Sequence, residues 1–149
     1  MAQRAVIEGG ISMFDRIVLA ANGAANSWKA VWATVDLAEK RRSDVLVLHV
    51  LEGPKDPPLS DVGGSTGDCI EFVDKAVSIL KDAGVSATGE ARMSASASVP
   101  WMIVEAARER DASLIVIGSG DRTDGDDPFL RNVTERVLHI APSSVLVVR

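Results

Sequence analysis

Short apolar stretches alternate with segments of helical periodicity along the chain. Five stretches have the character of strands, and they cover Arg16–Ala21, Asp44–Val50, Val85–Met93, Leu114–Ile117 and Val145–Val148. Four segments between them repeat apolar residues at helical spacing, and they cover 27–39, Cys69–Ala83, Val99–Arg110 and Asn132–His139. This alternation predicts an α/β domain with a parallel sheet, right-handed crossovers and helices on both faces.

Polar residues at the segment ends predict where the helices start and stop. The predicted N-terminal caps are Ser27, Asp68, Ser98 and Asn132. Gly84 follows the second helical segment and is a predicted C-cap. Val85–Met93 is more polar than the other strands, which places it at an edge of the sheet. The proline- and glycine-rich stretch 52–67 is predicted to be a long loop.

The composition is that of one soluble domain. The chain has 149 residues, 46% of them hydrophobic and 25% charged, and a formal net charge of −5. That charge does not favour nucleic acid or an anionic membrane as a partner. No apolar run is long enough for a membrane span. A single cysteine, Cys69, fits a reducing compartment, and we therefore expect a cytoplasmic protein.

The N-terminus lacks the apolar stretch of a secretory signal. We interpret residues 1–12 as a flexible extension and residues 13–149 as the domain. Met13 directly precedes the first strand, so Met1 and Met13 both remain open as the true start.

The last 36 residues combine a strand, a polar loop, a helix and a final strand. The fourth strand runs into Gly118-Ser119-Gly120, which is the layout of a phosphate-binding loop at the carboxyl edge of a parallel sheet. Between Gly118 and Arg131, however, four aspartates stand against two arginines, a net charge of −2. The layout indicates a phosphate site, whereas the charge opposes phosphate.

Three stretches resemble the universal stress protein family, from Phe14 to Arg149. They are RIVLAANGAANS, VLVLHV and ASLIVIGS with RNVTERVLHIAPSSVLVVR. The resemblance implies an open parallel five-stranded sheet in the order 3-2-1-4-5. Such a fold is Rossmann-like, similar to that of the adenine nucleotide alpha hydrolases, and the family's members are usually dimeric. It also implies a regulatory stress-response module rather than an enzyme.

The sequence departs from the motif of the family's nucleotide-binding members. That motif is a glycine, two residues, a second glycine, nine residues, a third glycine, and serine or threonine. Gly118 holds the first place, but Asp121, Arg131 and Asn132 hold the others. Asn22 stands where the binders have an aspartate that contacts the adenine and ribose side of the ligand.

The resemblance places a degenerate nucleotide site in the crevice between the first and fourth strands. Its candidate residues are Ala20, Ala21, Asn22, Val50, Gly118, Gly120, Asp121, Arg131, Asn132, Val133 and Thr134. A carboxylate about 4 Å from a phosphate charge opposes it by roughly 4 kcal/mol at an effective dielectric near 20. We therefore predict weak or absent ATP binding and no obligatory cofactor. Two alternatives remain open: binding of ATP, AMP or cyclic AMP, with Mg²⁺ for charge relief, and slow Mg²⁺-dependent nucleotide hydrolysis by the loop aspartates.

Other reactive side chains have simpler interpretations. His49 ends a buried strand and is predicted to be a hydrogen-bonded structural residue, and His139 suits the end of a helix. Neither histidine lies at metal-ligand spacing from other ligands, so no metal site and no catalytic residue is predicted. Trp28 and Trp32, one helical turn apart, are expected to pack in a core or an interface.

The final strand is expected at a sheet edge. It is short, apolar and β-branched, so an unpaired edge there would favour association. Two copies related by a two-fold axis can pair such edges. The predicted homodimer interface is Val145, Leu146, Val147 and Val148.

Overall fold

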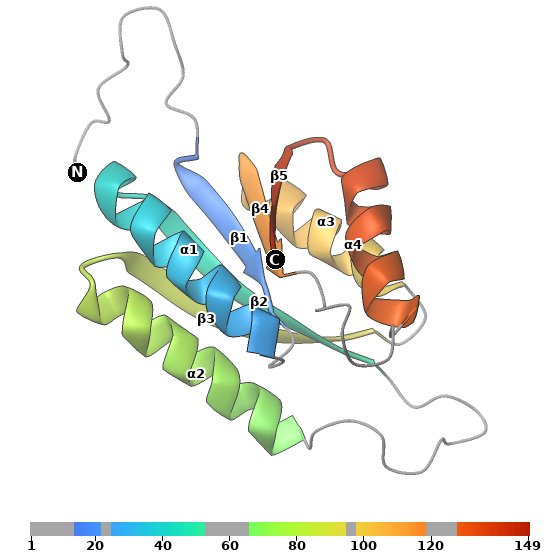
Figure 1. The fold of residues 1–149 in the computed structure, drawn as a ribbon, viewed down its shortest axis with the longest axis horizontal. Helices are drawn as coiled ribbons and strands as arrows, with labels where there is room; N and C mark the ends of the chain where they lie inside the picture. Colours follow the sequence, from blue (N-terminus) through green and yellow to red (C-terminus); the bar gives the residue numbers. More distant parts are fainter. Residues whose placement is uncertain (1–13, 22–24, 53–65, 95–97, 119–127) are drawn as a thin grey trace, which may run out of the picture.

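The structure of the protein, a computed structural model, describes residues 14–21, 25–52, 66–94, 98–118 and 128–149. Its elements are β1 (Arg16–Ala20), α1 (Ala25–Arg41), β2 (Asp44–Glu52), α2 (Thr66–Asp82), β3 (Ser86–Ser94), α3 (Val99–Glu109), β4 (Leu114–Gly118), α4 (Pro128–Ile140) and β5 (Ser144–Val148). The strands form one parallel sheet in the order β3-β2-β1-β4-β5 (Figure 1). The predicted sheet and its order are confirmed. The predicted extension 1–12 lies outside the described residues.

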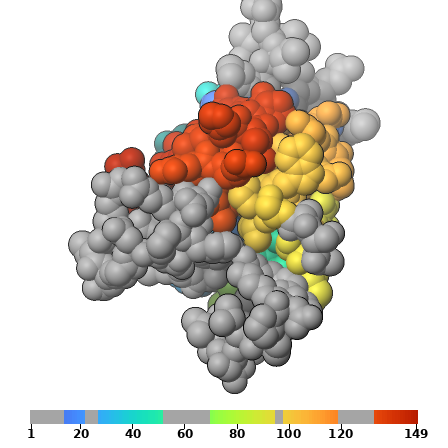
Figure 2. Space-filling view, turned by 90° about the vertical axis from the view of Figure 1, so that its right-hand side faces the viewer, coloured from blue at the N-terminus to red at the C-terminus, as the bar shows by residue number. Residues whose placement is uncertain are grey.

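Helices cover both faces of this sheet. Helices α1 and α2 lie on one face and α3 and α4 on the other (Figure 1). Figure 2 shows α3 and α4 side by side on their own face of the molecule. The strand side chains alternate between two cores, one under each helix pair.

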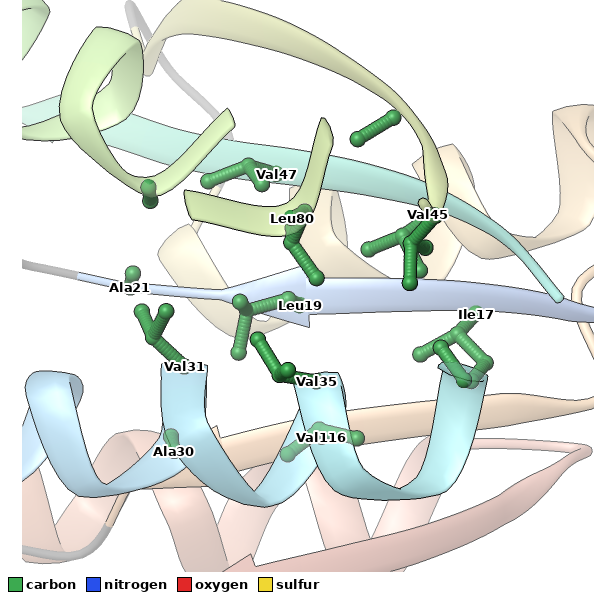
Figure 3. Packing of buried hydrophobic residues seen from close by; sticks show 14 of the residues in the cluster. Ile17, Leu19, Ala21, Ala30, Val31, Val35, Val45, Val47, Leu80 and Val116 are labelled. Atoms are coloured by element: carbon green, nitrogen blue, oxygen red, sulfur yellow. The ribbon is translucent and has the colours of Figure 1, made fainter. Parts of the chain in front are cut away.

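Strand β1 shows why its sequence is a continuous apolar run. Ile17 and Leu19 face α1, where Val31 and Val35 pack against them (Figure 3). Val18 belongs to the core under α3 and α4. Ile17, Val18 and Leu19 are all at most 1% exposed, and each such burial contributes about 1.5–3 kcal/mol. A strand covered on both faces has no polar side to display.

The edge strands are β3 and β5, as expected for both. In β3 the burial alternates weakly, with Ala87 buried and most neighbours exposed. In β5, Val145 and Val147 pack toward the core under α4, whereas Leu146 is 39% exposed. No helix in the described ranges is long and apolar enough to cross a membrane.

Three predicted helix starts are wrong. Helix α1 begins at Ala25, so Ser27 lies inside it and is 3% exposed. Helix α2 begins at Thr66, before the predicted cap Asp68. Helix α4 begins at Pro128, four residues before Asn132. Alanine at the start of α1 favours helix, and proline at the start of α4 favours a first helical turn. Thr66 and Gly67 at the start of α2 have no such preference.

The predicted N-cap of α3 and the predicted C-cap of α2 are confirmed. Ser98 is the N-cap of α3, although its side chain makes no capping hydrogen bond. Gly84 has a φ of 80°, the left-handed conformation expected of a glycine C-cap. The predicted loop 52–67 is shorter than expected, because Glu52 belongs to β2 and α2 takes up residues from Thr66 onward. The remainder of that stretch is not among the described residues.

Candidate functional site

The order of the strands reverses between β1 and β4. From β1 the chain crosses first to β2 on one side, and it later returns to place β4 on the other. At the carboxyl end, Ala20 of β1 is level with Leu48 of β2 and with Ile117 of β4. Ligands of open parallel sheets bind outside the carboxyl ends at such a switch point. The described structure therefore places the predicted crevice where the topology favours a ligand.

Part of the predicted site gathers on the face covered by α3 and α4. Ala20, Val50, Ile117 and Val133 belong to one apolar cluster, with Ala20 7% and Val133 8% exposed. Thr134, beside Val133 on α4, is 7% exposed. The apolar residues among them come from β1, β2, β4 and α4 and pack into one cluster, which we call the apolar floor of the predicted crevice. Ile117 was absent from the predicted site, although its place as the last apolar residue of a buried strand was a usable signal.

The end of β1 is held to β2 through Ala21. The Ala21 amide donates to the Leu48 carbonyl at 3.0 Å, and the Ala21 carbonyl lies 2.7 Å from Nδ1 of His49. A carbonyl only accepts, so Nδ1 carries the proton in this bond. His49 is 6% exposed. The prediction of a hydrogen-bonded structural histidine is confirmed, and its partner is the residue at the mouth of the crevice.

The start of α4 changes which amides face the preceding loop. If Asn132 had been the cap, the unpaired amides of the first turn would have included those of Val133 and Thr134. With Pro128 as the first residue, those amides lie inside the helix and are used by it. Phe129 and Leu130 supply the unpaired N–H groups of the first turn instead, because proline has none.

Of the remaining predicted site residues, some lie in described elements and some lie outside the described residues. Gly118 is the last residue of β4 and is level with Val148 of β5. Arg131 and Asn132 lie in α4, where only the backbone is described. Three further candidates, Asn22, Gly120 and Asp121, lie outside the described residues.

No group of three or more histidine, cysteine, aspartate or glutamate side chains in the described ranges is arranged to hold a metal ion. A strong charge cluster does occur on the face of α3. Arg92 donates to Glu90 and Glu109, each at 2.6 Å, and these hydrogen bonds raise the pKa of its guanidinium. The two acids share one cation, so the cluster fastens β3 to α3 and keeps a net charge of −1.

Comparison with known proteins agrees with this architecture. Residues 13–149 match the model of the universal stress protein family. A universal stress protein from Synechocystis is 31% identical over 147 residues, covering 94% of this chain and 88% of the relative. The structure of a universal stress protein from Archaeoglobus fulgidus in complex with dAMP has a TM-score of 0.64, 24% identity, and coverage of 94% of this chain and 100% of the other. A universal stress protein in complex with cAMP has a TM-score of 0.68, 18% identity, and coverage of 93% and 98%.

Proposed function

The chain belongs to the universal stress protein family, and we propose that it acts as a non-enzymatic stress-response module that binds ATP weakly or not at all. It works in the cytoplasm as a homodimer. The observation that carries the ATP proposal is the loop between Gly118 and Arg131. Residues 118–131 keep the spacing of the family's motif in sequence, but their net charge is −2, and Asp121 and Arg131 replace two of the glycines. Arg131 itself lies in α4.

Both features of the loop act against a triphosphate. Glycine lets backbone N–H groups approach a phosphate closely, and a residue with a Cβ hinders that approach. One carboxylate near a phosphate opposes it by roughly 4 kcal/mol, about a thousandfold in affinity. The start of α4 at Pro128 adds a third factor, because the amides of Val133 and Thr134 are engaged within the helix.

The second candidate function is binding of an adenine nucleotide with fewer negative charges. It is favoured by the structural neighbours in complex with dAMP and cAMP and by the apolar floor of Ala20, Val50, Ile117 and Val133. An apolar floor suits a flat base, and a single phosphate meets less repulsion from the loop than three do. Mg²⁺ shared between loop carboxylates and phosphates would reduce that repulsion further.

Calorimetric titration with ATP, AMP and cyclic AMP, with and without Mg²⁺, separates these functions. We expect no ATP binding at micromolar concentrations without metal. Micromolar ATP binding in the absence of Mg²⁺ would contradict the main proposal, and tight binding of AMP or cyclic AMP would establish the second candidate. Release of ADP from ATP during the titration would instead identify a slow hydrolase.

The proposed dimer interface is the exposed edge of β5. Val145 and Val147 are half-buried against the core under α4, so the strand is held in place, while Leu146 projects with 39% exposure. We expect light scattering to give the mass of a dimer. Leu146→Lys should shift the mass toward the monomer, whereas Leu138→Lys, at a leucine of α4 that is 51% exposed, should not. A monomeric parent protein at high concentration would refute the interface.

A further inference from the structure

A groove lies between α1 and α2, on the face of the sheet that these two helices cover. The two helices run beside each other on one face of the sheet (Figure 1). The α1–α2 groove has a volume of about 550 Å³, and its lining is Trp28, Ile70, Glu71, Asp74, Lys75, Ser78, Ile79 and Asp82. That volume lies within the range of binding sites in proteins.

Apolar side chains form part of the lining of the α1–α2 groove. Trp28 packs edge-on against Phe72, with ring centroids 4.5 Å apart and an interplanar angle of 62°. This contact confirms the expected packing role for Trp28. Ile70, in contrast, is 47% exposed, and Trp32, one turn beyond Trp28, is 58% exposed. Large apolar side chains left exposed next to a hollow mark an interaction surface.

The rim of the groove carries unbalanced negative charge. Glu71 is neutralised by Lys75, whose Nζ lies 2.7 Å from its carboxylate. Asp74 and Asp82 also line the groove and form no ion pair with any side chain in the described ranges. An occupant with positive charge would therefore meet two carboxylates that are not ion-paired within the described ranges.

The spacing of these residues defines the shape of the occupant. Ile70, Asp74, Ser78 and Asp82 are four residues apart and form one ridge of α2. From Ile70 to Asp82 this ridge is about 18 Å long, the length of a helix of about 12 residues. Ile70 begins this ridge and Asp74 and Asp82 follow, while Trp28 and Ile79 add apolar contacts beside it. Such a surface matches a helix with an apolar stripe flanked by lysine or arginine.

We propose that the α1–α2 groove binds a basic amphipathic helix of a partner protein. The partner's apolar stripe packs on Trp28, Ile70 and Ile79, and its cations pair with Asp74 and Asp82. The groove lies on the α1 and α2 face, whereas the apolar cluster of Ala20, Val50, Ile117 and Val133 lies on the α3 and α4 face.

The test uses the full chain and a labelled helical peptide of leucine and lysine, about 12 residues long to match the ridge. Fluorescence anisotropy at about 0.15 M salt limits steering by distant charges, which are screened beyond about 8 Å. We expect saturable binding that Asp74→Asn with Asp82→Asn weakens about five- to tenfold. Ile70→Ser should weaken it as well. Glu105→Gln with Asp111→Asn makes the same charge change on the other face and should leave the affinity unchanged.

Three results would overturn the proposal. Equal weakening by both double variants would show that the peptide responds to net charge alone. Equal binding of a leucine and glutamate peptide would show that the acids play no part. A change in the protein's own mass on Ile70→Ser, measured by light scattering, would show that a second copy fills the groove. Circular dichroism verifies that each variant is folded, which we expect because all five positions are exposed.

Discussion

Three helices end in the same hydrogen-bonded turn, which makes their backbone strain directly comparable. In each turn one residue is left-handed, with φ of 54° at Arg42, 80° at Gly84 and 50° at Asp111. In the turn of Gly84, the amide of Val85 donates to the Leu80 carbonyl at 2.9 Å, and the same bond closes the other two turns. Only one of the three left-handed positions is a glycine, so substitutions at the other two test the cost of a side chain there.

The expected effects have opposite signs at Gly84 and Arg42. A Cβ on Gly84 would meet no atom within 4 Å, so Gly84→Ala acts on the backbone alone. The left-handed strain of about 1–2 kcal/mol is partly offset, because alanine has about 0.5–1 kcal/mol less conformational freedom to lose from the unfolded chain than glycine. The expected net cost is about 0.5–1 kcal/mol of stability. Arg42→Gly removes the same strain. Glycine loses more conformational freedom on folding than arginine does, which lowers the gain in stability by about 0.5–1 kcal/mol. The net gain at Arg42 is therefore expected to be about 0.5–1 kcal/mol.

Urea denaturation measures both effects as shifts of the unfolding midpoint with an unchanged slope. In a chain of this size, 1 kcal/mol also moves the melting temperature by about 2–4 °C. Arg42→Ala is the matched control, because it removes the arginine side chain and keeps the left-handed strain. If Arg42→Gly is no more stable than Arg42→Ala, or if Gly84→Ala is neutral, the left-handed turn is not the source of the strain.

Three further predictions concern the core and the loop. A Cβ on Gly89 would lie 2.5 Å from a methyl group of α2. Gly89→Ala should therefore lower the free energy of unfolding by about 1–3 kcal/mol. An unchanged midpoint of urea unfolding would mean that α2 moves away freely. His49→Phe leaves the Ala21 carbonyl without its hydrogen-bond donor. In the same assay the free energy of unfolding should fall by about 1–3 kcal/mol. Unaltered stability would show that another donor replaces the imidazole. Asp121→Gly with Arg131→Gly keeps the loop's net charge and should strengthen ATP binding several-fold through closer backbone approach; unchanged calorimetric affinity would place the defect outside these two positions.

The strands were predictable because their physical cause is local. A strand covered on both faces must be apolar throughout, and Ile17, Val18 and Leu19 satisfy that requirement in sequence and in structure. The strand order came from the resemblance to a family, because periodicity says nothing about which strands pair. Helix starts were the weakest predictions. Many polar residues can cap a helix, and only tertiary packing decides that Ser27 is buried inside α1.

The candidate sites also differ in how far the sequence predicts them. Its floor was predictable, since the carboxyl ends of parallel strands converge at a switch point, and Ala20 and Val50 do lie in one cluster there. The α1–α2 groove was not predictable from the sequence, because it depends on contacts between distant segments. Trp28 and Phe72 are far apart in sequence, and nothing in the spacing of either helix shows that their rings meet. Periodicity identifies apolar faces without showing which of them remain uncovered.

The presence of the crevice does not by itself predict a ligand. Ala20, Ile117 and Val133 line its floor and are also members of the core that holds α4 on the sheet. Replacing Val133 by alanine would therefore lower stability whether or not a nucleotide binds, and a loss of binding in that variant would be uninformative. A test of function therefore needs residues whose substitution does not disturb the fold. In this chain the aspartates between Gly118 and Arg131 give the predicted phosphate site its negative charge, and changing that charge tests ATP binding directly.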